Sequence, residues 1–469
     1  MLILRKSVLL LLVCSLSFFA QTKLPSFFSN NMVLQQNKNV AIWGMDKPET
    51  FITVSGSWGK DANVQVGEDG NWKLKLQTPL AGGPYTVVVN GSQKITLANV
   101  MIGEVWLCSG QSNMQMTLNG YGNQPIIGSN EAILNSKNEQ IRLFNTKRIP
   151  SLEPLDDVVG EWFNSDPSTV GEFSAVAYFF AKKMNSILNV PIGLIHTSWG
   201  GSKVEAWMDE EVITSEFEYL EIPTEIPEKG QNHKPTLLYN GMIHPFVGYN
   251  IAGTIWYQGE SNHRNAEEYK KLFPSMIELW REKWEQQDLP FYFVQISPFN
   301  YNDSLAAFLR EAQLYSMQTV ENTGMVVTMD IGNCTNIHPA EKRLVGYRLA
   351  YWALSKTYNI PGIAFSGPVY KAMKKIEDGK IQLTFDYAKH GLNSFGKELS
   401  GFTISSEDKV FYPAQVKINR DKTLNVWSEK VKNPVAVRYG FEDCPDGTLF
   451  NSEGLPAPSF RTDSWNEIK

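Results

Sequence analysis

Serine, glycine, amide and histidine residues occur in four short runs, each following a predicted apolar strand. The runs are Ser109-Gly110-Gln111-Ser112-Asn113-Met114, Ser198-Trp199-Gly200-Gly201-Ser202, Gln258-Gly259-Glu260-Ser261-Asn262, and the stretch from Asp330 through Asn336 and His338 to Pro339. A hydroxyl, an imidazole base and fixed N–H donors are the groups that nucleophilic acyl transfer requires. Ligands of open α/β sheets bind outside the carboxyl ends of the strands, so the four runs predict one shared site.

The elements that must position these runs alternate between buried strands and amphipathic helices. Apolar strands are predicted at 102–108, 191–197, 251–257, 291–296 and 325–331. Apolar residues at helical spacing predict helices at 172–188, 269–284, 304–319 and 340–356. This alternation predicts an α/β fold with a parallel sheet that is covered by helices on both faces.

Short β signals flank this central region on both sides. Residues 21–100 read as a small β-rich domain, 101–360 as the α/β catalytic domain, and 361–469 as a β-sandwich-like domain. The polar, proline-bearing stretch 213–236 is expected to be an exposed insertion in the catalytic domain.

Composition excludes several classes of protein. The 469 residues include 43 Lys and Arg against 49 Asp and Glu, a net charge of −6, which argues against a nucleic-acid binder. The chain is 42% hydrophobic and only 20% charged, so it is not intrinsically disordered. Four Cys and no C-x-x-C pair argue against a disulfide scaffold or a thiolate zinc site.

The amino terminus has the pattern of an export signal. Arg5 and Lys6 precede an apolar stretch within residues 1–20, which is short for a membrane span. We therefore expect a signal peptide at 1–20, an exported protein in the periplasm or outside the cell, and no stable membrane span. Removal of this segment leaves three Cys, so at most one disulfide can form.

Several motifs in the same order resemble the sialate O-acetylesterase family, a group of SGNH (GDSL-type) hydrolases that includes carbohydrate acetylesterases. They are Gly103-Glu104-Val105-Trp106, Gln111-Ser112-Asn113-Met114, Ser198-Trp199-Gly200-Gly201, the stretch from Leu238 to Pro245, Trp256 to Asn262, Leu309 to Gln313, Ile337-His338-Pro339, and the carboxyl-terminal stretches 365–368 and 451–461. The resemblance covers nearly the whole chain after residue 20. It implies a flavodoxin-like, three-layer SGNH hydrolase domain and no metal or organic cofactor.

The resemblance implies Ser112 as the nucleophile, with Ser109 as the rival serine. It also implies an oxyanion hole made of the Ser112 N–H, Gly201 or Gly200, and the Gln258 amide, for which Asn262 is the alternative. His338 is the expected general base, because a neutral imidazole can take the serine proton.

The other histidines are weaker candidates for the base. His196 lies inside an apolar strand, where a satisfied core histidine is the usual case, and His244 is expected to line the site.

The third member of the catalytic set is left open. SGNH hydrolases often carry Asp three residues before the His, but Thr335 stands there and the next residue, Asn336, is an amide. A Ser–His dyad, oriented by a backbone carbonyl or by Asn336, is one interpretation. Asp330 reaching the imidazole from the strand end is another, and Glu260 supplying the charge is a third.

Six residues are expected to bind substrate: Asn113, Trp199, Glu260, Asn262, His244 and Arg310. Arg310 could pair with a substrate carboxylate such as that of sialic acid, although a structural role on its helix is the more common one. Trp106, Trp256 and Tyr257 also lie in or beside the motifs, and several of these aromatics are expected to wall a sugar-ester pocket.

The leading hypothesis is an exported serine esterase that removes O-acetyl groups from a glycan or from sialic acid through an acetyl-enzyme intermediate. Acetylated xylan is the alternative substrate. Two hypotheses of other classes are a glycoside hydrolase with Glu260 and Asp330 as paired carboxylates, and a non-catalytic glycan-binding protein.

Overall fold

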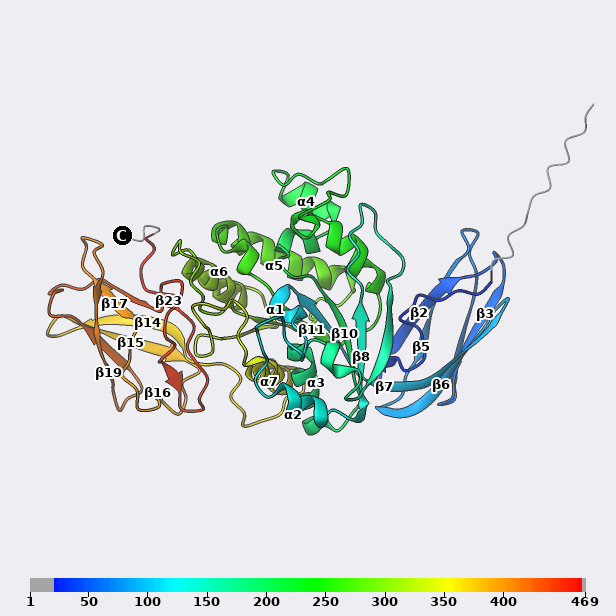
Figure 1. Cartoon of the computed structure of the whole chain (residues 1–469), viewed down its shortest axis with the longest axis horizontal. Coiled ribbons are helices and arrows are strands. Elements are labelled where there is room, and N and C mark those ends of the chain that lie inside the picture. The colour runs from blue at the N-terminus through cyan, green and yellow to red at the C-terminus, as the bar shows by residue number, and fades with distance from the viewer. Residues whose placement is uncertain (1–20, 466–469) are drawn as a thin grey trace, which may run out of the picture.

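The computed structural model describes residues 21–465, and the predicted signal peptide at 1–20 lies outside them. Three units follow one another along the long axis: a β unit, a central α/β unit and a second β unit (Figure 1). This order agrees with the β, α/β, β succession that the sequence predicts.

The first unit consists of seven short-to-medium strands. They are β1 (Val33–Gln35), β2 (Asn39–Met45), β3 (Phe51–Gly56), β4 (Lys60–Gln65), β5 (Asn71–Gln77), β6 (Gly82–Asn90) and β7 (Lys94–Gly110). In β5 the buried Trp72, Leu74 and Leu76 alternate with exposed polar residues, because successive side chains of a strand point to opposite faces.

Strand β7 joins the first unit to the second. Its first part pairs antiparallel with β6, and its residues Glu104–Gly110 pair parallel with β10 (Ile192–Ser198). The predicted boundary between residues 100 and 101 therefore falls inside one continuous strand. The sequence suggested two strands here because Asn99 interrupts the apolar pattern, and its φ of 57° accommodates a local bend.

The central sheet has the strand order β13-β12-β11-β7-β10-β8-β9. The further strands are β8 (Asn138–Thr146), β9 (Gly160–Ser165), β11 (Gly253–Tyr257), β12 (Phe291–Val294) and β13 (Thr323–Val326). All neighbours are parallel except β9, which runs antiparallel to β8. The predicted parallel sheet is thus confirmed, with an antiparallel edge strand added.

Helices cover both faces of this sheet. They are α1 (Ser112–Gln115), α2 (Ser129–Leu134), α3 (Ala175–Leu188), α4 (Glu210–Glu216), α5 (Ala266–Lys283), α6 (Ala306–Thr319) and α7 (Lys342–Trp352). Trp106 of β7 packs in one core cluster with α3 and α7, while the next residue, Leu107, packs in another with α5 and α6. A strand buried on both faces reads as a continuous apolar run, which is how β7 reads in the sequence. Within residues 21–465 no helix is long and apolar enough to cross a membrane.

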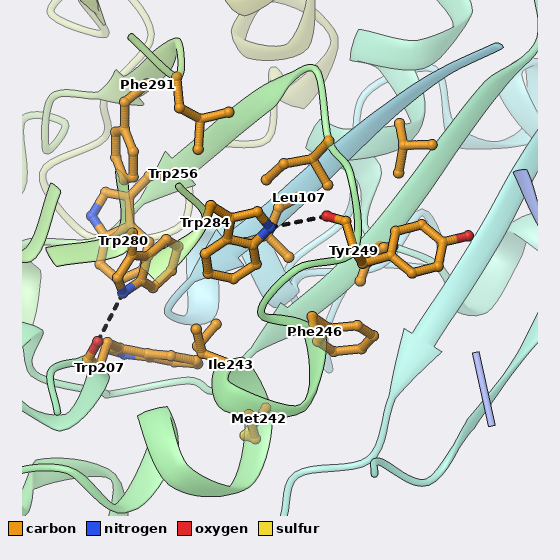
Figure 2. Close-up of a cluster of buried hydrophobic side chains, with 14 of the residues drawn as sticks. Leu107, Trp207, Met242, Ile243, Phe246, Tyr249, Trp256, Trp280, Trp284 and Phe291 are labelled. Atoms are coloured by element: carbon orange, nitrogen blue, oxygen red, sulfur yellow. Dashed lines mark hydrogen bonds between the residues drawn. The ribbon is translucent and has the colours of Figure 1, made fainter. Parts of the chain in front are cut away.

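Most of the motif aromatics belong to the core. Figure 2 shows Trp256 among Trp207, Trp280 and Phe291, and the Trp280 indole donates to the Trp207 carbonyl at 3.0 Å. Trp106, Trp256 and Tyr257 have no exposed surface. The expectation that these three wall a sugar pocket is therefore wrong, because they fill the space between the sheet and its helices.

The third unit is built from short antiparallel strands. They are β14 (Val369–Ile376), β15 (Lys380–Asp386), β16 (Leu392–Asn393), β17 (Phe402–Ser405), β18 (Tyr412–Pro413), β19 (Gln415–Ile418), β20 (Leu424–Trp427), β21 (Ala436–Tyr439), β22 (Phe450–Asn451) and β23 (Phe460–Arg461). Two four-stranded sheets, β14-β15-β20-β19 and β18-β17-β21-β23, enclose a separate core. The sequence did not predict strand β14, because three lysines at irregular spacing hide its apolar alternation.

Two devices fasten the third unit to the catalytic unit. A disulfide joins Cys334 to Cys444, which is the single bridge that the sequence allows. The fully buried Arg310 of α6 also reaches across and donates to carbonyl groups of residues 440–443.

Candidate active site

Ser112 stands at the carboxyl edge of the central sheet. β7 ends at Gly110, and Ser112 begins the short helix α1. Gly110 has a φ of 136°, and a Cβ on it would lie 2.2 Å from the Tyr257 carbonyl oxygen, so only glycine fits this close approach to β11. The chain therefore turns sharply after β7 and places Ser112 beyond the strand end.

His338 meets Ser112 from a loop 226 residues further along the chain. Its Nε2 lies 2.8 Å from Ser112 Oγ. The Tyr121 ring packs edge-on against the imidazole at a centroid distance of 5.3 Å, and the Tyr121 hydroxyl donates to the Ser112 carbonyl at 3.1 Å. The structure thus brings together the two residues that the sequence proposed as nucleophile and base.

Gln124 completes the hydrogen bonding of the imidazole. Its Oε1 lies 2.6 Å from His338 Nδ1, so Nδ1–H donates to the amide and Nε2 keeps its lone pair for the serine proton. Gln124 is held in a tight turn, in which its backbone N–H and carbonyl both bond Tyr121. The sequence offered no signal for this residue, since it is a lone glutamine in a loop of glycine and asparagine.

The three predicted third members lie elsewhere. Asp330 forms a bidentate ion pair with Arg348 at 2.8 and 2.6 Å, in a turn beyond β13, which ends at Val326 rather than at the predicted residue 331. The Asn336 side chain accepts from the His338 backbone N–H at 2.9 Å and not from the ring. Gln124 is therefore the group that accepts the hydrogen bond from the imidazole ring. This arrangement is a Ser–His dyad, as one interpretation expected, but the orienting amide belongs to Gln124 and not to Asn336.

Glu260 belongs to a buried network beneath the Ser112–His338 pair. The Asn113 amide donates to Glu260 Oε1 and, at 3.1 Å, to the Ile337 carbonyl, while Lys342 Nζ donates to Asn113 Oδ1. Asn113 and Glu260 are almost fully buried, so the expectation that they bind substrate is corrected. The network instead ties α1 to the loop that carries His338.

Burial sets the protonation of these groups. It raises the pKa of Glu260 and lowers the pKa of Lys342 to about 7. Burial, assisted by the nearby Lys342 cation, also lowers the pKa of His338 to about 4. The imidazole is therefore neutral at ordinary pH, as a general base must be.

Two backbone N–H groups are available for an oxyanion. Among residues 21–465, neither the Ser112 nor the Gly201 N–H donates to any described partner. Gly200 lies directly against Ser112, with an added Cβ 3.4 Å from that of Ser112, and its own N–H donates to Gln115 at 2.6 Å. Of the two predicted glycines, Gly201 therefore keeps the free donor.

The predicted side-chain donors of the oxyanion hole are already occupied. Both Gln258 amide hydrogens are used, to the Ser202 carbonyl at 3.0 Å and to Asn262 Oδ1 at 2.7 Å. Asn262 donates to Glu205 at 3.0 Å, and both amides are buried. The structure thus contradicts Gln258 as an oxyanion donor and Asn262 as its alternative or as a substrate ligand.

Two other predicted binding residues are bonded to protein groups. Arg310 donates to Ser459 and to the carbonyls of Gly440, Glu442 and Asp443, and it has no exposed surface with which to reach a substrate. His244 bonds the Leu155 carbonyl at 3.0 Å and packs on Tyr239. The predicted role of Arg310 is corrected to a structural one, while that of the half-buried His244 stays a prediction.

The rival serine and histidine are core residues. Ser109 is fully buried and its hydroxyl has no described partner. His196 bonds Asn145 at 2.8 Å and Ser198 at 2.6 Å, and burial lowers its pKa to about 3. Both residues lie inside the sheet, which leaves Ser112 and His338 as the solvent-facing pair.

Known proteins resemble this chain over most of its length. The family model described as carbohydrate esterase, sialic acid-specific acetylesterase matches residues 102–354. The mouse sialate O-acetylesterase is 30% identical, with 93% of this chain and 94% of that protein covered. The chain belongs to the sialic acid-specific acetylesterase family. The human sialate O-acetylesterase is 29% identical to the esterase, with 93% of this chain and 92% of that protein covered.

A solved structure matches the esterase in all three units. The crystal structure of a carbohydrate acetylesterase from Xanthomonas citri has a TM-score of 0.87 and 37% identity, and covers 95% of this chain and 100% of its own. The predicted enzyme class, a carboxylic ester hydrolase, is confirmed by these relatives. The glycoside hydrolase and non-catalytic hypotheses are therefore wrong, and Glu260 and Asp330 are each held by other partners.

The low pKa of His338 predicts an unusually acidic limb of the pH profile, and the Gln124 contact offers a way to move it. The acid limb of kcat/KM reports the free His338 imidazole, so activity should persist until the pH falls to about 4. In Gln124→Glu a carboxylate faces Nδ1 and favours the imidazolium, so the acid limb should move up by about 1–3 pH units. The measurement is kcat/KM for an aryl acetate between pH 3 and pH 9.

Gln124→Met is the matched neutral control. It removes one hydrogen bond worth about 1 kcal/mol, so kcat/KM should fall by about five- to tenfold while the acid limb stays in place. If the limb of Gln124→Glu coincides with that of the wild type, Gln124 does not contact the imidazole of the working enzyme.

Proposed function

We propose that the protein is an exported serine esterase that removes O-acetyl groups from sialic acid or a related glycan. The observation that carries the proposal is the 2.8 Å contact between Ser112 Oγ and His338 Nε2. It is supported by the family and by the sialate O-acetylesterases of mouse and human.

The geometry supports a two-step acyl transfer. Ser112 Oγ attacks the acetyl carbonyl carbon while its proton passes to His338 Nε2, and the Ser112 and Gly201 N–H groups stabilise the oxyanion. The imidazolium then protonates the departing sugar oxygen, which leaves an acetyl group on Ser112. Water, deprotonated by His338, attacks this acetyl-enzyme, releases acetate and restores the serine.

The parallel order of β7, β10 and β11 supports the finer assignment to an SGNH-type hydrolase. In that fold the nucleophile, the glycine and the amide follow successive strands, and the engaged Gln258 is where this chain departs from the pattern. In this proposal the backbone N–H groups of Ser112 and Gly201 donate the hydrogen bonds that stabilise the oxyanion.

Export is part of the proposal and has two supports. The first 20 residues carry the signal pattern, and Cys334–Cys444 is a disulfide of a kind that persists in oxidising compartments. The test is fractionation of cells that produce the full chain, with the amino-terminal residue of the product sequenced. An intact chain that remains in the cytosol would contradict export.

The test of the activity is acetate release from a panel of O-acetylated sialic acids and acetylated xylan. The proposal expects release from the sialic acid esters, with xylan as the neutral comparison. A protein that hydrolyses an aryl acetate but releases no acetate from any sugar ester would overturn it.

A further inference from the structure

An exposed arginine lies at the rim of the site and is not part of the catalytic machinery described above. Arg148 follows β8, which runs parallel to β10, so it emerges at the same sheet edge as Ser112. Its guanidinium lies 5.9 Å from the ring centroid of Trp199, the residue that follows β10. The Trp199 backbone N–H donates to the Gly110 carbonyl at 3.0 Å, two residues before Ser112.

Arg148 also acts electrostatically on a residue that contacts the catalytic pair. Burial raises the pKa of Tyr121 to about 12, and the Arg148 cation opposes that rise, so Tyr121 lies within electrostatic reach of Arg148. Tyr121 is the residue whose hydroxyl bonds Ser112 and whose ring packs on His338. Arg148 is therefore in contact with Trp199 and within electrostatic reach of Tyr121, and both of these residues touch the site.

The N–H groups of the Arg148 guanidinium have no partner among the described residues. In the described part of the chain Arg148 forms no ion pair and no hydrogen bond, in contrast to the fully engaged Arg310. The half-buried Trp199 indole restricts the orientation of the Arg148 guanidinium. This cation–π contact leaves the guanidinium N–H groups exposed to water or to a ligand. A planar fork of this kind matches the two oxygens of a carboxylate.

We propose that Arg148, oriented by Trp199, binds the carboxylate of an acidic O-acetylated sugar and sets the preference of the esterase for acidic over neutral sugars. The inference rests on the proposed function and deepens it, because it names the residue that reads the substrate's charge. The sequence offered Arg310 as a candidate for this role, with a structural role as the more common alternative, and the buried Arg310 has the structural role.

The test compares two substrates that differ only at the carboxyl group: 9-O-acetyl-N-acetylneuraminic acid, which is negatively charged, and its carboxyl methyl ester, which is neutral. The ratio of kcat/KM for the acid to that for the ester should fall by about 10- to 100-fold in Arg148→Gln, the range expected for one charge-assisted interaction. Lys147→Gln is the matched control, since Lys147 is the adjacent exposed cation and has no described contact with Trp199 or Tyr121. Its ratio should equal that of the wild type.

An unchanged ratio in Arg148→Gln would overturn this inference while leaving the esterase proposal intact. An equal fall of the acid-to-ester ratio in Arg148→Gln and Lys147→Gln would also overturn it. That result would mean that any positive charge on this surface favours the acidic substrate. Failure of the proposed function has a different signature, namely that the wild type releases no acetate from either substrate.

Discussion

Ser112→Ala is expected to lower kcat/KM for acetyl esters by at least about 10³-fold. The variant removes the oxygen that forms the acetyl-enzyme and leaves His338 without the proton that it accepts at 2.8 Å. His338→Ala should cost about as much, and the double variant should be no worse than either single one, because the two residues act as a unit.

Ser109→Ala is the matched control for this experiment. Ser109 lies three residues earlier, on β7, but its hydroxyl is fully buried and without a described partner. This variant should keep its activity, and the missing buried hydroxyl should not destabilise it. Hydrolysis of an aryl acetate and detection of the acetyl-enzyme by mass spectrometry are the measurements, and a fully active Ser112→Ala protein would end the serine mechanism.

Arg310→Met is expected to lower the free energy of unfolding by about 3–4 kcal/mol. The guanidinium satisfies carbonyl groups of Gly440, Glu442 and Asp443 inside the junction with the third unit. Without it the buried carbonyls of Gly440 and Asp443 lose this partner, at about 1–3 kcal/mol for each unsatisfied group. Urea unfolding, followed by tryptophan fluorescence, is the measurement.

Arg264→Gln is the control for stability. Arg264 pairs with Asp303 at 2.9 Å, but its side chain is 69% exposed, so its loss should cost about 1 kcal/mol or less. The sequence-based hypothesis for Arg310 expects the opposite pattern, with normal stability and a selective loss of activity on acidic sugars. A wild-type urea midpoint for Arg310→Met would restore that hypothesis.

Features that depend on neighbours in the sequence were predictable. The buried strands, the main helices and the succession of three units follow from hydrophobic period and turn residues, which act over a few positions. The proximity of Ser112 and His338 followed from the rule that strand ends of a parallel sheet share an edge. Strand ends were less certain, as β7 and β13 show, because pairing partners decide where a strand continues.

Side-chain roles in the site were less predictable, because they depend on contacts between distant segments. Gln258, Asn113 and Glu260 have types that suit a catalytic pocket, yet each is buried and bonded to other protein groups. A buried polar group must find a partner, and the sequence does not show whether that partner is a substrate or another side chain.

The sequence by itself therefore determined the family, the α/β centre between two β units, and the serine and histidine that can perform ester hydrolysis. Only the tertiary structure showed that Gln124, 214 residues from His338, accepts the imidazole hydrogen bond, and that Arg310 is buried while the exposed Arg148 contacts Trp199. The physical reason is that residue type and local spacing fix what a group can do chemically. Burial and long-range hydrogen bonds decide which of those groups remain free to do it.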